Sequence, residues 1–106
     1  ATVANLPASS SGYDIYVYTA GDNGSATRTA TFQISGPGIT TTSVSATDSA
    51  GTSFNGVFTQ ANNSPGNYVK FTIGASATSF TLTATPGTST DPYKRAPING
   101  MQIIPH

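Results

Sequence analysis

Cysteine and glutamate are both missing from this chain of 106 residues, and charged side chains of any kind are scarce. Without cysteine the protein has no disulfides, no thiol chemistry and no zinc–thiolate sites. Four basic and four acidic residues give a formal net charge of zero. A nucleic-acid binder needs clustered cations that displace counterions from phosphates. The few cations here are dispersed along the chain, so we expect no nucleic-acid partner.

Long hydrophobic runs are also missing. No apolar stretch approaches the ~20 residues that a membrane-spanning helix needs, so we expect no membrane span. Threonine, serine, glycine and asparagine are abundant instead, and lysine is rare. Such a composition is typical of secreted bacterial β-modules, whereas cytosolic domains usually cover their surface with lysine and glutamate. We therefore expect the protein to be secreted or displayed at the cell surface.

The apolar residues follow the spacing of strands rather than of helices. No useful window repeats them at helical spacing, whereas alternate apolar positions recur between turns that contain glycine, proline, asparagine or serine. This pattern predicts one all-β domain over residues 1–106, an antiparallel β-sandwich of jelly-roll type with seven or eight short strands. The predicted strands cover residues 2–6, 13–19, 29–35, 39–46, 53–60, 68–73, 79–85 and 98–104.

Two predicted strands depart from clean alternation. Residues 39–46 are rich in threonine and serine, which favours a place at a sheet edge. In residues 53–60 the alternation breaks at Asn55, where a bulge or bend is expected. This segment is expected to contribute three apolar residues to the core: Phe54, Val57 and Phe58.

Catalytic machinery is not evident in the sequence. Glycoside hydrolysis normally needs two carboxyl groups that flank the bond. Three of the four aspartates (Asp22, Asp48 and Asp91) lie in turn-like contexts, where aspartate caps its own backbone. The one histidine, His106, is the last residue, so a serine–histidine–aspartate triad has no firmly held imidazole. We expect no enzymatic activity.

Residues 21–25 offer one candidate metal site. Asp22, the side chain of Asn23 and nearby carbonyls could supply oxygen ligands to a structural calcium ion. The alternative is a hairpin turn, because Asn-Gly is the strongest short signal for a turn of primed type. The turn is favoured, and the calcium site stays open. No other cofactor is expected.

One strand face carries the groups that a sugar-binding surface needs. Alternation in residues 13–19 places Asp14, Tyr16 and Tyr18 together on the face opposite the core. Tyrosine rings can pack against the C–H face of a sugar while carboxylates and amides bind its hydroxyls. The alternative is that both tyrosines pack beneath a neighbouring strand, loop or partner. In residues 91–95, Tyr93 is expected to be exposed in a loop, where it could contact a ligand. Arg95 beside it could donate hydrogen bonds to that ligand or pair with Asp91 instead.

Six sequence blocks occur in an order that resembles a known kind of module. The blocks are Leu6-Pro-Ala, Tyr13-Asp-Ile-Tyr-Val-Tyr, Gly21-Asp-Asn-Gly, Gly66-Asn-Tyr-Val-Lys-Phe, Ser79-Phe-Thr-Leu-Thr-Ala and Arg95-Ala-Pro-Ile-Asn-Gly-Met-Gln-Ile. The series resembles a jelly-roll module of large secreted and surface proteins of environmental bacteria, similar to galactose-binding-like and carbohydrate-binding-module sandwiches. The resemblance implies a non-catalytic module whose partner is a polysaccharide or cell-surface glycan.

The resemblance also bears on protein partners. Modules of this kind usually carry a glycine- and asparagine-rich portion before the Leu-Pro-Ala segment, so such an N-terminal portion or other copies of the chain are expected as partners. The alternative function is a structural subunit of an extracellular filament, sheath or surface assembly. Its motivation is an uncharged surface with strand-like ends, because open sheet edges accept a strand from another chain.

Overall fold

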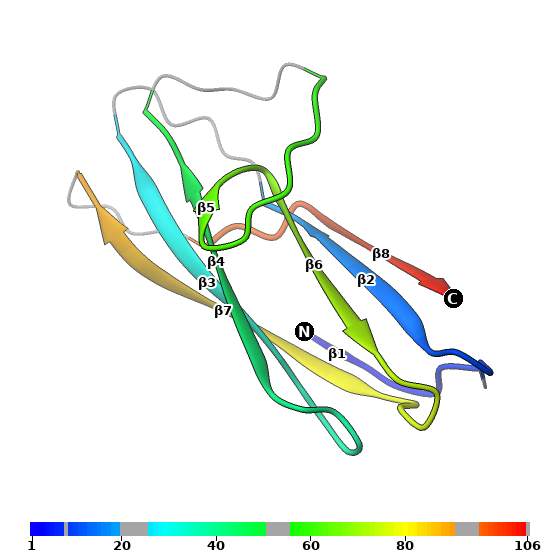
Figure 1. The fold of residues 1–106 in the computed structure, drawn as a ribbon. Coiled ribbons are helices and arrows are strands. Elements are labelled where there is room, and N and C mark those ends of the chain that lie inside the picture. Colours follow the sequence, from blue (N-terminus) through cyan, green and yellow to red (C-terminus); the bar gives the residue numbers. More distant parts are fainter. Residues whose placement is uncertain (8, 20–25, 51–55, 91–95, 106) are drawn as a thin grey trace.

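The computed structural model describes residues 1–7, 9–19, 26–50, 56–90 and 96–105, which form eight strands in two sheets (Figure 1). One sheet has the order β1-β7-β3-β4-β5 and the other has the order β6-β2-β8. Neighbouring strands are antiparallel except β4 and β5, which are parallel. The strands are β1 (Thr2–Val3), β2 (Tyr13–Tyr18), β3 (Arg28–Ser35), β4 (Thr42–Asp48), β5 (Ser64–Pro65), β6 (Tyr68–Ile73), β7 (Phe80–Ser89) and β8 (Gly100–Pro105).

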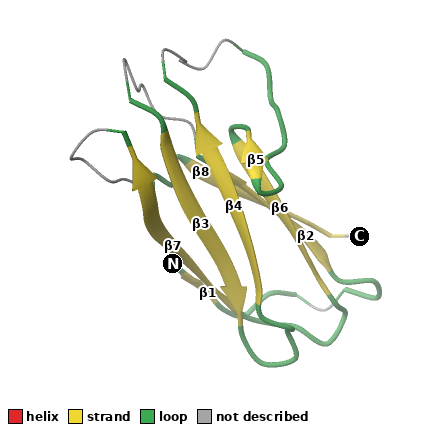
Figure 2. Ribbon diagram, turned by 60° about the vertical axis from the view of Figure 1, so that its left-hand side comes forward, coloured by secondary structure: helices red, strands yellow, loops and turns green. Residues whose placement is uncertain are grey.

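The two sheets pack face to face, which confirms the predicted all-β sandwich (Figure 2). Every connection between consecutive strands crosses from one sheet to the other, except β3 to β4 and β4 to β5. Because of this alternation, β2, β6 and β8 become neighbours although they are far apart in the sequence. Within the described residues, no helix is long and apolar enough to cross a membrane.

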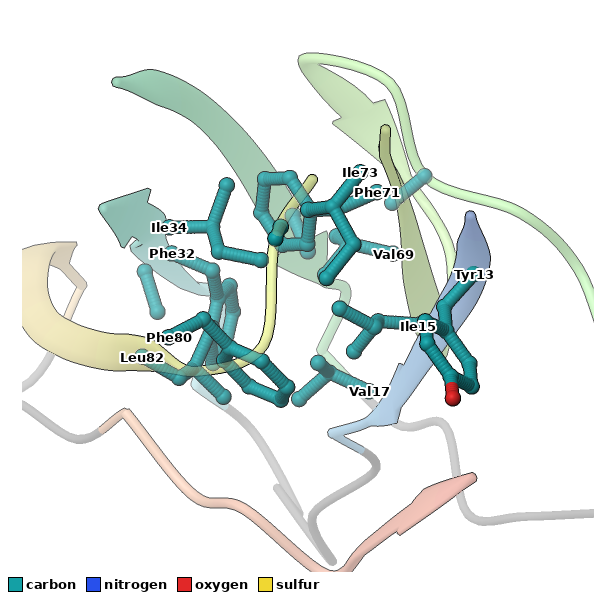
Figure 3. Packing of buried hydrophobic residues seen from close by; sticks show 14 residues of the cluster. Tyr13, Ile15, Val17, Phe32, Ile34, Val69, Phe71, Ile73, Phe80 and Leu82 are labelled. Carbon is teal, nitrogen blue, oxygen red and sulfur yellow. The ribbon is translucent and has the colours of Figure 1, made fainter. Parts of the chain in front are cut away.

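The space between the sheets is filled mainly by the alternate apolar side chains of β2, β3, β6 and β7 (Figure 3). Strand β2 alternates strictly between buried and half-buried positions, as a strand with one face on a core must. Burial of each large apolar side chain contributes roughly 1.5–3 kcal/mol. Eleven of the residues that alternation predicts to point inward are confirmed as buried: Tyr13, Ile15, Val17, Ala30, Phe32, Ile34, Val69, Phe71, Ile73, Phe80 and Leu82. Ala84, also predicted to point inward, is only partly buried and packs against this core.

The strand predicted over residues 53–60 is wrong in its described part. Residues 56–59 form no strand, and Gln60 makes only an isolated bridge to Tyr68. Gly56 has a φ of 86°, which turns the chain away from an extended course. Val57 and Phe58 are consequently not core residues, with 59% and 60% of their surface exposed. Phe54 lies outside the described residues.

The segment predicted as a sheet edge is more enclosed than its composition indicates. Strand β4 begins at Thr42 and lies between β3 and the short strand β5, which local pattern did not predict. The main chain of Ser45 is bonded by Asn63, which donates its N–H to the Ser45 carbonyl and accepts the Ser45 N–H on its side chain, both at 2.9 Å. Elsewhere the bounds shift: β1 ends at Val3, β7 continues to Ser89 and β8 begins at Gly100.

Candidate functional site

The outer face of the β6-β2-β8 sheet, which we call the tyrosine face, brings together side chains from three distant segments. In β2 the inward positions are buried, so Asp14, Tyr16 and Tyr18 lie on the opposite face, as alternation predicts. Their neighbours follow from the register of the two antiparallel pairs. Across the sheet the rows are Thr72–Asp14–Ile104, Lys70–Tyr16–Gln102 and Tyr68–Tyr18–Gly100.

Three tyrosines and a phenylalanine form a continuous aromatic cluster at this face. The Tyr68 ring centroid lies 6.1 Å from that of Tyr16 and 6.0 Å from that of Tyr18, with interplanar angles of 48° and 45°. Phe58 approaches Tyr18 edge-on, with the centroids 5.3 Å apart and the planes at 67°. Tilted and edge-to-face arrangements at these distances are the favourable geometries for aromatic pairs. The rings therefore hold one another in place.

Polar side chains surround the cluster and are themselves fixed. The Lys70 ammonium lies 3.6 Å from Asp14 Oδ2, and the Thr72 hydroxyl donates to Asp14 Oδ1 at 2.8 Å. The same ammonium lies 5.6 Å from the Tyr16 ring centroid, within range of a cation–π interaction. At the other side of β2, the Tyr18 hydroxyl donates to Gln102 Oε1 at 3.1 Å. Donors and acceptors thus flank the rings on both neighbouring strands.

Tyr16 and Tyr18 are partly covered by other aromatic side chains of the tyrosine face. Both side chains are half-buried, because each packs against Tyr68 and Tyr18 also packs against Phe58. The Tyr18 hydroxyl has a partner in Gln102. The two tyrosines are therefore neither core residues nor isolated surface residues. They form the base of an outward-facing aromatic cluster.

Two aromatic members of the cluster were not predicted as site residues. Alternation in residues 68–73 places Tyr68 outward, but only the pairing of β6 with β2 brings it to Tyr16 and Tyr18. Phe58 was assigned to the core, because a phenylalanine in a strand-like stretch usually lies there. No local sequence signal could have corrected this assignment, because the bonds from Asn67 and the close approach at Gly66 that hold residues 57–61 beside β6 arise only in the tertiary structure.

The outer face of the other sheet has a different chemistry. It carries hydroxyl and amide side chains in register across β4, β3 and β7, and several pair with each other, such as Thr29 with Thr47 at 3.0 Å. Two rows across this face are Ser45–Thr31–Thr85 and Ser43–Gln33–Thr83. Because these rows hold no ring, they offer no apolar surface for stacking. The tyrosine face is therefore the better candidate site.

Four candidate residues lie outside the described part of the chain: Tyr93, Arg95, Asp22 and Asn23. Their predicted roles in ligand and calcium binding stay predictions. Within the described ranges, no group of three or more histidine, cysteine, aspartate or glutamate side chains is placed to hold a metal ion.

The chain was compared with known proteins at three levels. No family model, no curated protein and no solved structure matches it. The likeness to carbohydrate-binding modules therefore rests on the sequence blocks alone, and function has to be argued from the geometry of the tyrosine face.

Proposed function

We propose that the protein is a non-catalytic, extracellular glycan-binding module that uses the tyrosine face. The observation that carries the proposal is the aromatic cluster of Tyr16, Tyr18, Tyr68 and Phe58, flanked by fixed hydrogen-bonding groups. The rings supply apolar area for the C–H face of a sugar. Tyrosine does so at low conformational cost, because only two side-chain torsions need to be fixed.

The charges on the face favour an uncharged saccharide. The one ion pair that the described residues place there joins Lys70 to Asp14, so the cation is accompanied by an anion. For an acidic polymer, attraction to Lys70 is offset by repulsion from Asp14, so the pair offers its carboxylates no net attraction. A neutral sugar can instead accept a hydrogen bond from the ammonium and donate one to the carboxylate. These bonds are charge-assisted, and hence stronger than bonds between neutral groups.

The test is binding to a panel of immobilised neutral and acidic polysaccharides, followed by Tyr16→Ala and Tyr18→Ala on whichever polymer the wild type retains. Each variant is expected to lose binding while keeping the circular dichroism spectrum of the wild type. Thr83→Ala, on the opposite outer face, is the matched control and should bind normally. Retention of acidic polysaccharides alone would contradict the preference for an uncharged saccharide, and failure of the wild type to bind any polysaccharide would contradict the whole proposal.

A structural subunit joined by strand pairing is the second candidate, and one observation favours it. Among the described strands β8 pairs with β2 alone, and none of its six residues carries a charge that would discourage pairing with another chain. Ile104 on this strand is 40% exposed. Sedimentation velocity at high concentration tests this candidate. A strand-paired assembly should dissociate in Ile104→Lys, whereas a monodisperse wild-type monomer would exclude it.

A further inference from the structure

We propose that the glycan site extends beyond the sheet onto residues 57–59, with Phe58 as its outermost aromatic contact and Asn67 as the residue that positions it. The inference rests on the proposed function. It adds to the site Phe58, which lies outside the regular strands and so is not placed there by strand alternation. It starts from the exposure of Phe58, which is 60% although its ring lies beside Tyr18. Burial of a phenylalanine side chain stabilises a fold, so the protein gives up part of that stabilisation at this position.

Hydrogen bonds to Asn67 hold the segment in place. The Asn67 side chain accepts the N–H of Thr59 on Oδ1 and donates from Nδ2 to the Val57 carbonyl, both at 2.8 Å. Its main-chain N–H donates to the Thr59 carbonyl at 2.9 Å. The residues on either side of Phe58 are therefore bonded to one asparagine. Because these bonds use the backbone, the position of Phe58 does not depend on burial of its own ring.

Asn67 is itself anchored to the sheet that carries the tyrosines. Its carbonyl accepts the N–H of Thr19, the residue that follows β2, at 2.9 Å. The next residue, Tyr68, begins β6 and contacts Tyr18. One asparagine thus links the end of β2, the start of β6 and the segment that carries Phe58. This linkage fixes the backbone around Phe58 relative to β2, and the Phe58 ring contacts Tyr18 from there.

Gly66 permits the close approach of the segment. A β-carbon at this position would lie 2.7 Å from both the Thr59 carbonyl oxygen and the Ala61 nitrogen. Both contacts are with backbone, which cannot move aside as a flexible side-chain end can. The backbone of residues 59–61 therefore lies against a residue that has to be glycine. The arrangement is a preorganised one, which lowers the entropic cost of binding.

Phe58 therefore extends the aromatic surface of the tyrosine face at its margin. Tyr16 and Tyr68 are half-buried within the sheet face, whereas Phe58 stands at its margin with most of its surface exposed. Along β2, from Tyr18 to Asp14, the face changes from aromatic rings to the Asp14–Lys70 pair over about 13 Å at ~3.3 Å per residue. A short stretch of saccharide can rest its C–H face on Phe58 and direct hydroxyls to the polar end.

The experiment measures affinity of the intact chain for xylan, galactan, mannan and mixed-linkage β-glucan by affinity electrophoresis and calorimetry. Phe58→Ala is expected to weaken binding of the retained polymer about tenfold, whereas Phe58→Trp, which keeps the aromatic surface, should stay within about threefold. Val57→Ala is the matched control, since Val57 is equally exposed but offers no ring. Its affinity should equal that of the wild type.

Asn67→Ala tests the positioning role separately. It should weaken binding as Phe58→Ala does, and the double variant Phe58→Ala/Asn67→Ala should bind no worse than Phe58→Ala, because Asn67 acts through Phe58. If the losses of affinity of the two single variants add in the double variant, Asn67 does not act through Phe58. That result would overturn its assignment as the residue that positions Phe58. Wild-type binding that Phe58→Ala leaves unchanged would overturn this inference alone. No binding of any of the four polymers by the wild type would overturn the proposed neutral-glycan function together with it.

Discussion

The Lys70 ammonium lies 3.6 Å from the Asp14 carboxylate across the β2–β6 pair, in a diagonal rather than a directly opposite relation. Residue 70 is directly opposite Tyr16, and residue 14 is directly opposite Thr72. The lysine side chain therefore reaches past the Tyr16 ring to the carboxylate, which explains why its ammonium also lies 5.6 Å from the ring centroid. One cation thus links the charged end of the tyrosine face to its aromatic centre.

This ion pair should contribute little to folding. The Lys70 side chain is 35% exposed, and partly exposed pairs are screened by water and salt. A double-mutant cycle with Lys70→Met and Asp14→Asn is expected to give a coupling free energy of about 0.5 kcal/mol. Urea denaturation in low and high salt measures it, and the coupling should shrink as salt is added. A coupling above about 2 kcal/mol that salt does not change would contradict this expectation.

Tyr13 should stabilise the fold through its hydroxyl as well as its ring. The ring is buried at the start of β2, and the hydroxyl donates to the Pro7 carbonyl. Tyr13→Phe keeps the ring but leaves this acceptor without its donor, so the free energy of unfolding is expected to fall by about 1–2 kcal/mol. The control is Tyr16→Phe, since the Tyr16 hydroxyl makes no hydrogen bond within the described ranges. Equal effects of the two substitutions in chemical denaturation would refute the role given to the Pro7 bond.

Gly12 should be among the least replaceable residues of the chain. Its φ is 89°, and an added β-carbon would lie 2.0 Å from the Ile73 carbonyl oxygen. Gly12→Ala therefore combines an unfavourable backbone conformation with a backbone clash, and we expect it to cost at least about 3 kcal/mol. Gly74 is a close control, because a β-carbon there meets no atom within 4 Å. In thermal denaturation Gly74→Ala should resemble the wild type, and a similar drop for both variants would count against this explanation.

We expect Asn63 to stabilise β4 by binding the main chain of Ser45. The Asn63 φ of 56° suits glycine, so Asn63→Gly removes the side-chain acceptor of the Ser45 N–H without straining the backbone. The free energy of unfolding should fall by about 1–2 kcal/mol, since the bond is lost and glycine adds freedom to the unfolded chain.

Amide hydrogen exchange gives a local measurement of the same effect. The Ser45 N–H should exchange faster in Asn63→Gly than in the wild type, because its acceptor is gone. Asn62→Gly is the control, as the hydrogen bond of Asn62 to Ser64 Oγ uses its main-chain N–H and survives the change. Unchanged Ser45 exchange in Asn63→Gly would show that Asn63 does not protect this part of β4.

Local sequence pattern predicted the strands whose alternation is unbroken. Strand β6 was predicted over residues 68–73 and has these bounds, and β2 differs from its prediction by one residue. The pattern misplaced residues 56–60, because the hydrogen bonds that hold this segment come from Asn67 rather than from a neighbouring strand. A local pattern contains no information about such a partner.

Local alternation was enough to assign the inward and outward faces of the regular strands. Successive side chains of a strand point to opposite faces, so the buried positions of β2 placed Asp14, Tyr16 and Tyr18 outside. The neighbours of these three side chains depend instead on how the strands pair. Strand pairing joins segments that are distant in the chain, and its register brings Tyr68, Lys70 and Gln102 to the two tyrosines of β2. The course of the chain around the exposed Phe58 likewise depends on bonds between separate segments, because the neighbouring Val57 carbonyl accepts a hydrogen bond from Asn67.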